Sequence, residues 1–239
     1  MRPRSTPTSA WLCPFLGYLQ RAMTQSAIFD GLLTYLFFIP LLTFHEWAHA
    51  WVAWKCGDDT AYNQGRVTLN PIMHMELIGT VVLPLLGIFL SLSNSALAGF
   101  IIGWGRPVPV NISNLRSPRR DDTLVALAGP AINVLLAFAL LALVKGCALA
   151  GVAGFEEVGL RMAVLSLFLC FFNLLPIPPL DGSHVLKNAI GMSYETYWKL
   201  CQYGFIMVIV AINIPGVREV VGLATKATFL AMAAALNLR

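Results

Sequence analysis

Charged side chains are scarce in this sequence. Of its 239 residues, 12% are charged and 57% are hydrophobic, and the mean hydropathy is +0.71. Soluble domains carry about a quarter charged residues, because their surface has to be polar. The composition therefore excludes a soluble globule and an intrinsically disordered chain, and it predicts a membrane protein with several spans.

A strong charge of one sign and closely spaced cysteine pairs are also absent. The formal net charge is only +4, and no basic stripe stands beside exposed aromatic residues, so we expect no nucleic-acid partner. The five cysteines lie far apart, without a C-x-x-C pair: Cys13, Cys56, Cys147, Cys170 and Cys201. This spacing predicts neither a disulfide framework nor a zinc site made of cysteines.

What the sequence has in quantity is apolar runs. They cover residues 28–54, 77–104, 124–144, 160–175, 205–214 (in a helix that we expect to begin near Tyr194) and 217–238. About 20 apolar residues suffice for a helix to cross a bilayer. We expect an all-α, polytopic membrane helix bundle with about five to six apolar segments. Its parts would be an N-terminal extension (1–27) that could lie at the interface, a core (28–216) and a C-terminal apolar helix (217–239).

Residues His45-Glu46-Trp47-Ala48-His49 form an H-E-x-x-H pattern at the end of the first run. In a helix, residues four apart share a face, so both imidazoles could bind one Zn²⁺ ion. Glu46 would then reach a water molecule at the metal and act as general base. Ionisable side chains next to a long apolar stretch are costly, which favours a functional role. The alternative is a short amphipathic helix whose His and Glu side chains merely face water.

A catalytic zinc site usually has three protein ligands. Asp181 is the strongest candidate for the third, because it follows a proline cluster where an apolar helix breaks off. Its carboxylate could instead cap a helix over residues 183–190. His74 and His184 are rival ligands, or polar residues that support the ligands.

Several motifs together resemble the site-2 protease family of intramembrane zinc metalloproteases, in its compact bacterial branch without a PDZ domain. The resemblance covers roughly residues 28–216 and implies one zinc ion held by His45, His49 and Asp181, with Glu46 as base. The motifs are the H-E-x-x-H pattern, Leu180-Asp181-Gly182 after Asn173-x-x-Pro176, Ala128-Gly129-Pro130-x-x-Asn133, Gly57-Asp58-Asp59-Thr60-Ala61, Gly65-Arg66-x-Thr68-Leu69-Asn70-Pro71, Ile78-Gly79-Thr80 and 103–111.

The charge pattern predicts the membrane topology. Residues 105–122 include four arginines and should face the cytoplasm, whereas residues 146–157 should be external. For the three ligands to meet, the helix ends that carry them must lie on the same side of the membrane. The chain must then cross the membrane an odd number of times between these two helices. The run 77–104 should therefore be a re-entrant hairpin that turns at the polar residues 91–95. The zinc site would then lie toward the cytoplasmic side.

The predicted function is that of an intramembrane zinc metalloendopeptidase. Its partners would be the lipid bilayer and a transmembrane protein or peptide substrate, and we expect a multi-pass protein of the bacterial inner membrane. Asn133 and Asn173 could bind substrate or the developing oxyanion, or form hydrogen bonds between helices. The alternative functions are a metal-ion transporter and a catalytically inactive membrane chaperone or adaptor of the same fold.

Overall fold

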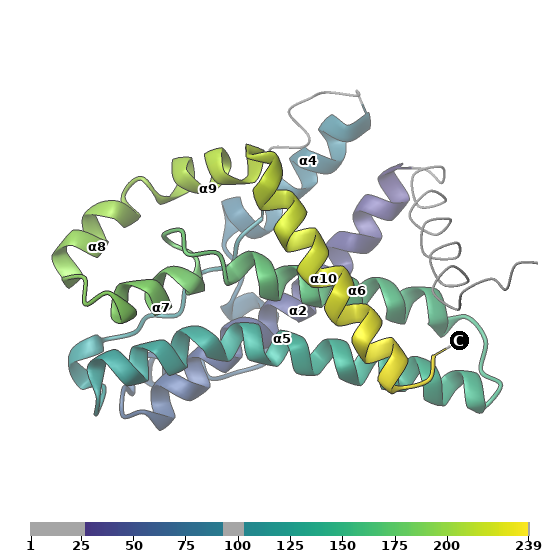
Figure 1. Cartoon of the computed structure of the whole chain (residues 1–239), viewed down its shortest axis with the longest axis horizontal. Helices are drawn as coiled ribbons and strands as arrows, with labels where there is room; N and C mark the ends of the chain where they lie inside the picture. Colours follow the sequence, from purple (N-terminus) through teal and green to yellow (C-terminus); the bar gives the residue numbers. More distant parts are fainter. Residues whose placement is uncertain (1–26, 93–102, 239) are drawn as a thin grey trace, which may run out of the picture.

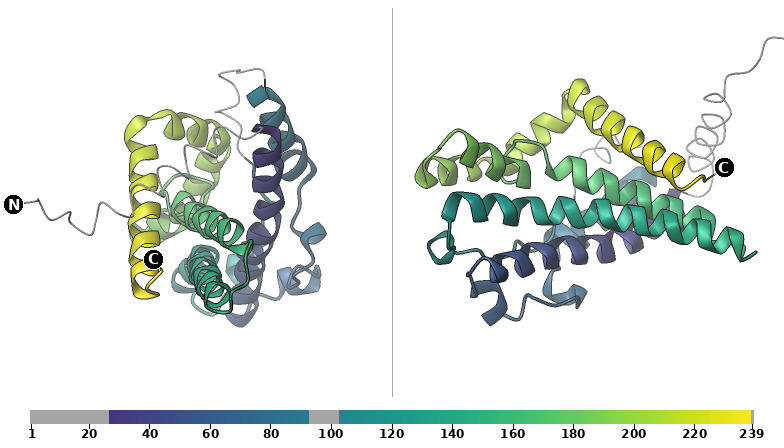
Figure 2. Two further views of the ribbon diagram at one scale, coloured as in Figure 1. Left: turned by 90° about the vertical axis from the view of Figure 1, so that its right-hand side faces the viewer. Right: turned by 60° about the horizontal axis from the view of Figure 1, so that its bottom comes forward.

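The computed structural model describes residues 27–92 and 103–238. In this part the chain is helical and contains no β-strand, which confirms the all-α prediction. The longest helices of the described part are α2 (Ala27–Lys55), α5 (Pro118–Leu149), α6 (Phe155–Asn173) and α10 (Pro215–Ala235). Helices α5 and α6 lie between α2 on one side and α10 (Pro215–Ala235) on the other (Figures 1 and 2).

Small and branched apolar residues hold the two central helices together. The buried core joins Ala137 and Leu141 of α5 to Ala163 and Leu167 of α6, with Phe229 of α10 against them. Alanine lets helix backbones approach closely, which suits packing inside a membrane. Pro118 stands in the first turn of α5, where a proline costs no hydrogen bond. A short turn with Gly151 and Gly154 at positive φ angles then reverses the chain into α6.

The predicted continuous helix from Tyr194 to residue 214 is wrong. The chain forms α8 (Tyr194–Cys201) and α9 (Gly204–Asn213) instead, and α9 is followed by α10 at a bend of 81°. Gly204 explains the first break, because a Cβ atom there would lie 2.7 Å from Pro179. The second break falls at Pro215, which begins α10. Helix α10 covers most of the C-terminal apolar run, and the division of the chain into an extension, a core and a C-terminal helix stays a prediction.

Among the described residues, α5 alone is long and apolar enough to cross a membrane. The pair α9–α10 meets the same criterion only when the two bent helices are taken together, and Leu77–Leu90 forms a shorter apolar helix. The number of spans therefore stays a prediction.

The two ends of the run 77–104 meet each other. The run begins with η2 (Leu77–Val82), a π-helical segment, and continues into α4 (Leu83–Leu92). At its far end the backbone N–H of Trp104 donates to the carbonyl of Gly79 at 3.1 Å, and the Thr80 hydroxyl donates to the Trp104 carbonyl at 2.8 Å. A re-entrant hairpin requires such a meeting of ends. The predicted turn lies largely outside the described residues, so the hairpin stays a prediction.

The polar segment after α2 folds around one buried carboxylate. Asp58 accepts hydrogen bonds from Thr60, from the backbone N–H of Asn111 and from the Asn114 amide. Burial alone would raise the pKa of Asp58, but these donors stabilise the charged form and hold the pKa below its ordinary value. The bond network joins two stretches more than 50 residues apart. It includes the short helices α3 (Thr60–Asn63) and η4 (Ile112–Asn114), and η1 (Pro71–Met73) follows in the same segment.

Candidate metal centre

Three predicted ligand side chains converge at the end of α2. Nε2 of His45 lies 3.0 Å from Nε2 of His49, and the two nitrogens lie 3.1 and 3.4 Å from the Asp181 carboxylate oxygens. Both histidines are buried, and Asp181 is half-buried. In a tetrahedral zinc site with bonds of about 2.0–2.1 Å, ligand atoms are about 3.3–3.4 Å apart. The observed separations are close to this spacing.

The tautomer of His49 places the lone pair of its Nε2 atom opposite His45 and the Asp181 carboxylate. Nδ1 of His49 lies 2.7 Å from the carbonyl oxygen of Val125, which can only accept a hydrogen bond, so Nδ1 carries the proton. In the neutral imidazole Nε2 then presents a lone pair toward His45 and the carboxylate. Oδ2 of Asp181 is buried and has no hydrogen-bond donor in the described part of the chain. A cation at this point satisfies all three groups, so the residues present fit a zinc ion.

Asn133 of α5 supports the other imidazole. Its side-chain amide lies 3.1 Å from Nδ1 of His45, measured from Nδ2, and the residue is fully buried. As placed, Nδ2 faces Nδ1 and the amide oxygen Oδ1 has no hydrogen-bond partner among the described residues. When Nε2 of His45 binds a metal, Nδ1 carries the proton, and exchanging the two amide atoms of Asn133, which have the same shape, brings Oδ1 into position to accept it. The hydroxyl of Ser166 in α6 donates to the Asn133 backbone carbonyl at 2.7 Å, which fixes this part of α5. Asn133 is thus placed to orient a ligand, and its predicted contact with substrate stays a prediction.

Gly129 lies on α5 between Val125 and Asn133, and it packs against both imidazoles. A Cβ atom on Gly129 would lie 2.4 Å from Nε2 of His49 and 2.6 Å from Nε2 of His45. Atoms cannot approach so closely without displacement, so only glycine leaves room for the ligand atoms. Gly129 belongs to the motif Ala128-Gly129-Pro130 on which the family resemblance rests, and the structure gives this glycine a steric reason.

Asp181 is the first residue of α7 (Asp181–Ala189) and does not cap it. Leu180 occupies the N-cap position, and no side chain caps the helix there. The carboxylate of Asp181 points at the histidines instead. Gly182 makes this placement possible, because a Cβ atom there would lie 2.1 Å from the carbonyl oxygen of Leu174 at the end of α6. The start of α7 is therefore pressed against the helix that precedes it.

Glu46 lies between the two histidines in sequence, and a buried cation lies nearby. Arg66 is 2% exposed and donates from Nη2 to the carbonyl oxygen of Arg106 at 2.6 Å. Gly105 beside it packs against Leu42, one helical turn before Glu46. Burial lowers the pKa of Arg66, and the charge of the Glu46 carboxylate opposes this effect. The loops thus place a positive charge beside the predicted base.

The other candidate residues lie outside this group. His74 is fully buried with Nε2 2.7 Å from the carbonyl of Thr68, and His184 lies with Nδ1 3.1 Å from Asp122. Asn173 donates to the carbonyl of Leu169 one turn earlier in α6. Sequence reasoning did not single out Asp122 or the Val125 carbonyl. The sequence could have pointed to Asp122, because an aspartate at the start of a long apolar helix is unusual. It could not have pointed to Val125, because a backbone carbonyl is present in every residue.

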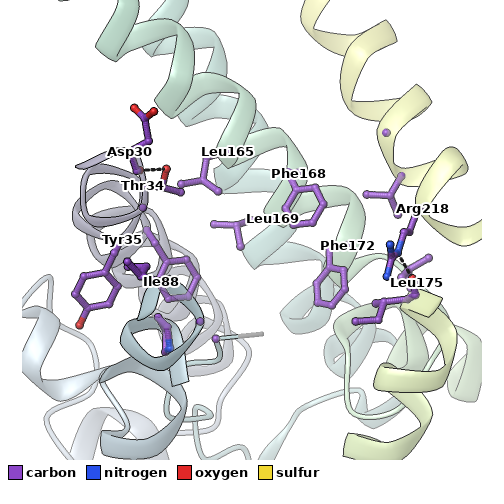
Figure 3. Close-up of a pocket in the computed structure, with 18 of the residues that line it drawn as sticks. Asp30, Thr34, Tyr35, Ile88, Leu165, Phe168, Leu169, Phe172, Leu175 and Arg218 are labelled. Carbon is purple, nitrogen blue, oxygen red and sulfur yellow. Dashed lines mark hydrogen bonds between the residues drawn. The ribbon is translucent and has the colours of Figure 1, made fainter. Parts of the chain in front are cut away.

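An apolar cavity of about 740 Å³ opens between α2, α4, α6 and α10. Figure 3 shows Asp30, Thr34 and Tyr35 on its α2 side, the Phe168 and Phe172 rings on α6, and Arg218 on α10. Its lining also includes Phe38, two helical turns before His45, and Leu175, six residues before Asp181. The cavity therefore extends along the two elements that lead to the metal ligands.

Comparisons with known proteins agree on one family. The sequence profile described as Peptidase family M50 matches residues 148–212, which include Asp181. The chain is 38% identical over 196 residues to the "Putative zinc metalloprotease YwhC" of Bacillus subtilis, covering 77% of this chain and 83% of that protein. It is also 32% identical over 181 residues to the "Putative zinc metalloprotease Rip2" of Mycolicibacterium smegmatis, covering 74% and 65%.

The "Putative zinc metalloprotease Rip2" of Mycobacterium tuberculosis is 35% identical over 153 residues, covering 61% of this chain and 52% of its own length. No solved structure matches the chain. The Bacillus relative aligns over most of both chains, and the resemblance drawn from the motifs is confirmed. The chain therefore belongs to peptidase family M50, the site-2 protease family.

Proposed function

We propose that this protein is an intramembrane zinc endopeptidase that hydrolyses peptide bonds of membrane-protein substrates within or near the bilayer. The observation that carries the proposal is the convergence of His45, His49 and Asp181 on one point, next to the carboxylate of Glu46 on the same helix. Membership of a peptidase family and the descriptions of the relatives support it.

His45, His49 and Asp181 would hold the ion. Bound zinc supplies Lewis acidity, which makes water more acidic and polarises a carbonyl group. Glu46 accepts a proton from the attacking water and later delivers it to the leaving amine nitrogen. Val125 and Asn133 keep the protons of both imidazoles on Nδ1, so that Nε2 remains free for the ion.

An apolar substrate segment fits the surroundings of this centre. The cavity between α2, α6 and α10 offers aromatic and aliphatic side chains along a path toward the ligands. A transmembrane helix has its carbonyl groups engaged in hydrogen bonds, so it has to unwind before water can attack it. Asn173 is half-buried near the end of α6, and its side chain would bind such an unwound segment.

Aromatic residues support a position of the centre near one membrane interface. Trp47 and Trp51 stack at 5.9 Å in the same turns of α2 as the histidines, and Lys55 lies 4.2 Å from the centre of the Trp54 ring. Tryptophan with nearby lysine is typical of the boundary between lipid and water. We propose that this boundary is the cytoplasmic one, because the arginines of residues 105–122 lie beside the same end of the bundle.

The test is Glu46→Gln in the purified protein, with a model transmembrane substrate in proteoliposomes. We expect zinc content to stay the same and cleavage to fall about 10²–10⁴-fold, the usual contribution of a general base. Glu157→Gln removes an exposed carboxylate of α6 and should leave cleavage unchanged. Undiminished cleavage by Glu46→Gln would contradict the role of Glu46. A wild-type protein that takes up zinc into vesicles but cleaves nothing would favour a transporter, and one that does neither would favour a chaperone or adaptor.

A further inference from the structure

Asp122 is a buried carboxylate that the reaction does not use. It is 3% exposed, and it lies near the start of α5, outside the group of candidate metal ligands. Three side chains of α7 point to it: His184 with Nδ1 at 3.1 Å, Lys187 with Nζ at 2.7 Å and Asn188 with Nδ2 at 2.7 Å. One carboxylate thus binds the same face of α7 through three donors.

Helix α7 begins with the metal ligand Asp181. Its start is held by the close approach of Gly182 to Leu174, and its Ser183 hydroxyl lies 2.8 Å from the Tyr197 hydroxyl of α8. These contacts fix where the helix begins. Its rotation and its distance from α5 depend on contacts further along α7, which include the three donors to Asp122 and a second bond from the Asn188 amide to the Thr123 hydroxyl at 3.0 Å.

The position of Asp122 on α5 links it to the rest of the centre. Residues 122, 125, 129 and 133 are spaced three, four and four apart, so they share one face of the helix. On this face Val125 binds His49, Gly129 lies against both imidazoles and Asn133 contacts His45. Asp122 extends the same face to the element that carries the third ligand. One side of α5 thus contacts both imidazoles and the helix that begins with Asp181.

We propose that Asp122 is a positioning residue, which holds α7 against α5 so that the Asp181 carboxylate completes the metal centre. The inference rests on the proposed function, because it assumes that His45, His49 and Asp181 bind a metal. Lys187 is 5% exposed and lies 4.9 Å from the centre of the Tyr197 ring, so its ammonium group is desolvated and depends on the Asp122 carboxylate. The ion pair therefore resists displacement by water.

The test compares metal affinity in matched variants. Asp122→Asn keeps the shape of the side chain and removes its charge, and the double variant Asp122→Asn/Lys187→Gln also removes the cation that would be left unpaired. Affinity for zinc is measured by competition with a chelator, and the geometry of the centre is followed by the visible absorption spectrum of the cobalt-loaded protein. Asp30→Asn is the control, because it breaks another ion pair of low exposure, with Arg161, at the far end of α2.

We expect both Asp122 variants to bind zinc about 10–100-fold more weakly, as is usual when a group supporting a metal ligand is removed, and to show an altered cobalt spectrum. Asn188→Ala should give a smaller loss, since it removes one donor without a change of charge. Asp30→Asn should keep its affinity within about twofold of wild type, since its bonding partners Arg161 and Thr34 lie away from the ligands in the described part of the chain.

Unchanged affinity and spectrum in the double variant would overturn the inference, as would an equal loss in Asp30→Asn. A wild-type protein that binds no metal would instead refute the proposed function, so the two failures can be distinguished.

Discussion

Gly129 of α5 lies directly against His49 of α2. A Cβ atom built on this glycine would stand 2.4 Å from Nε2, the nitrogen that faces Asp181. The two residues are 80 positions apart in the chain, and their contact determines how much space remains around the converging ligand atoms. A single methyl group at position 129 would occupy that space.

Gly129→Ala should therefore impair metal binding without unfolding the protein. The added methyl group has to push His45 and His49 away from Asp181, and we expect the bound zinc to fall at least tenfold. Gly146→Ala is the matched control, because Gly146 lies in the same helix with open space around its Cβ position. That change should leave zinc bound and raise stability by up to about 1 kcal/mol, since alanine favours a helix over glycine. Metal analysis of both variants after gel filtration checks this, and full zinc content in Gly129→Ala would refute the steric role.

Asn133→Ala should weaken metal binding by about 10–100-fold, because His45 loses the group that accepts its Nδ1 proton. Asn173→Ala should leave the affinity for zinc unchanged, since Asn173 bonds within its own helix at Leu169. If Asn173 binds substrate, its replacement should raise KM. Chelator competition and steady-state cleavage assays separate the two effects. Equal zinc affinities in Asn133→Ala and wild type would show that Asn133 does not orient the ligand.

Asp58→Asn should destabilise the polar loops by about 1–3 kcal/mol, because the amide cannot satisfy all the buried donors around it. The pKa of Asp58 is lowered in the folded protein, so its contribution is fully present above the pKa of the unfolded chain and is lost as the pH falls through the folded value. The difference between variant and wild type should be constant near neutral pH and shrink below pH of about 4. Thermal unfolding in detergent, with the exposed Asp59→Asn as control, measures it. A difference that persists unchanged under strongly acidic conditions would contradict this account.

The two ends of α5 should lie on opposite sides of the membrane. In a cysteine-free background, Arg119→Cys should react with an impermeant maleimide from the cytoplasmic side and Gly151→Cys from the outside. Both positions are exposed, so accessibility is decided by the membrane alone. Labelling of both from one side would show that α5 does not span, and it would remove the main support for the predicted topology.

The helices and the closeness of the two histidines could be predicted because their signals are local. An apolar run predicts a helix such as α5 directly, and the four-residue spacing of His45 and His49 places both on one face. The break between α8 and α9 could not be predicted, because it depends on the close approach of Gly204 to Pro179, a contact between distant parts of the chain.

The residues around the candidate ligands could not be predicted either, because their contacts also join distant parts of the chain. Asn133 appeared in the sequence as a candidate for substrate binding, and its contact with His45 arises only when α5 packs on α2. Asp122 gave no periodic signal, and its three donors lie more than 60 residues away. Such contacts follow from tertiary packing, which a single sequence does not specify locally.

The metal content of the purified protein tests the central claim most directly. Wild-type protein extracted in detergent should contain about one zinc ion per chain by elemental analysis, and Asp181→Ala should contain less than a tenth of that amount, because a centre with three protein ligands loses one of them. A wild-type protein without a bound transition metal, or an Asp181→Ala variant with the full content, would contradict the account.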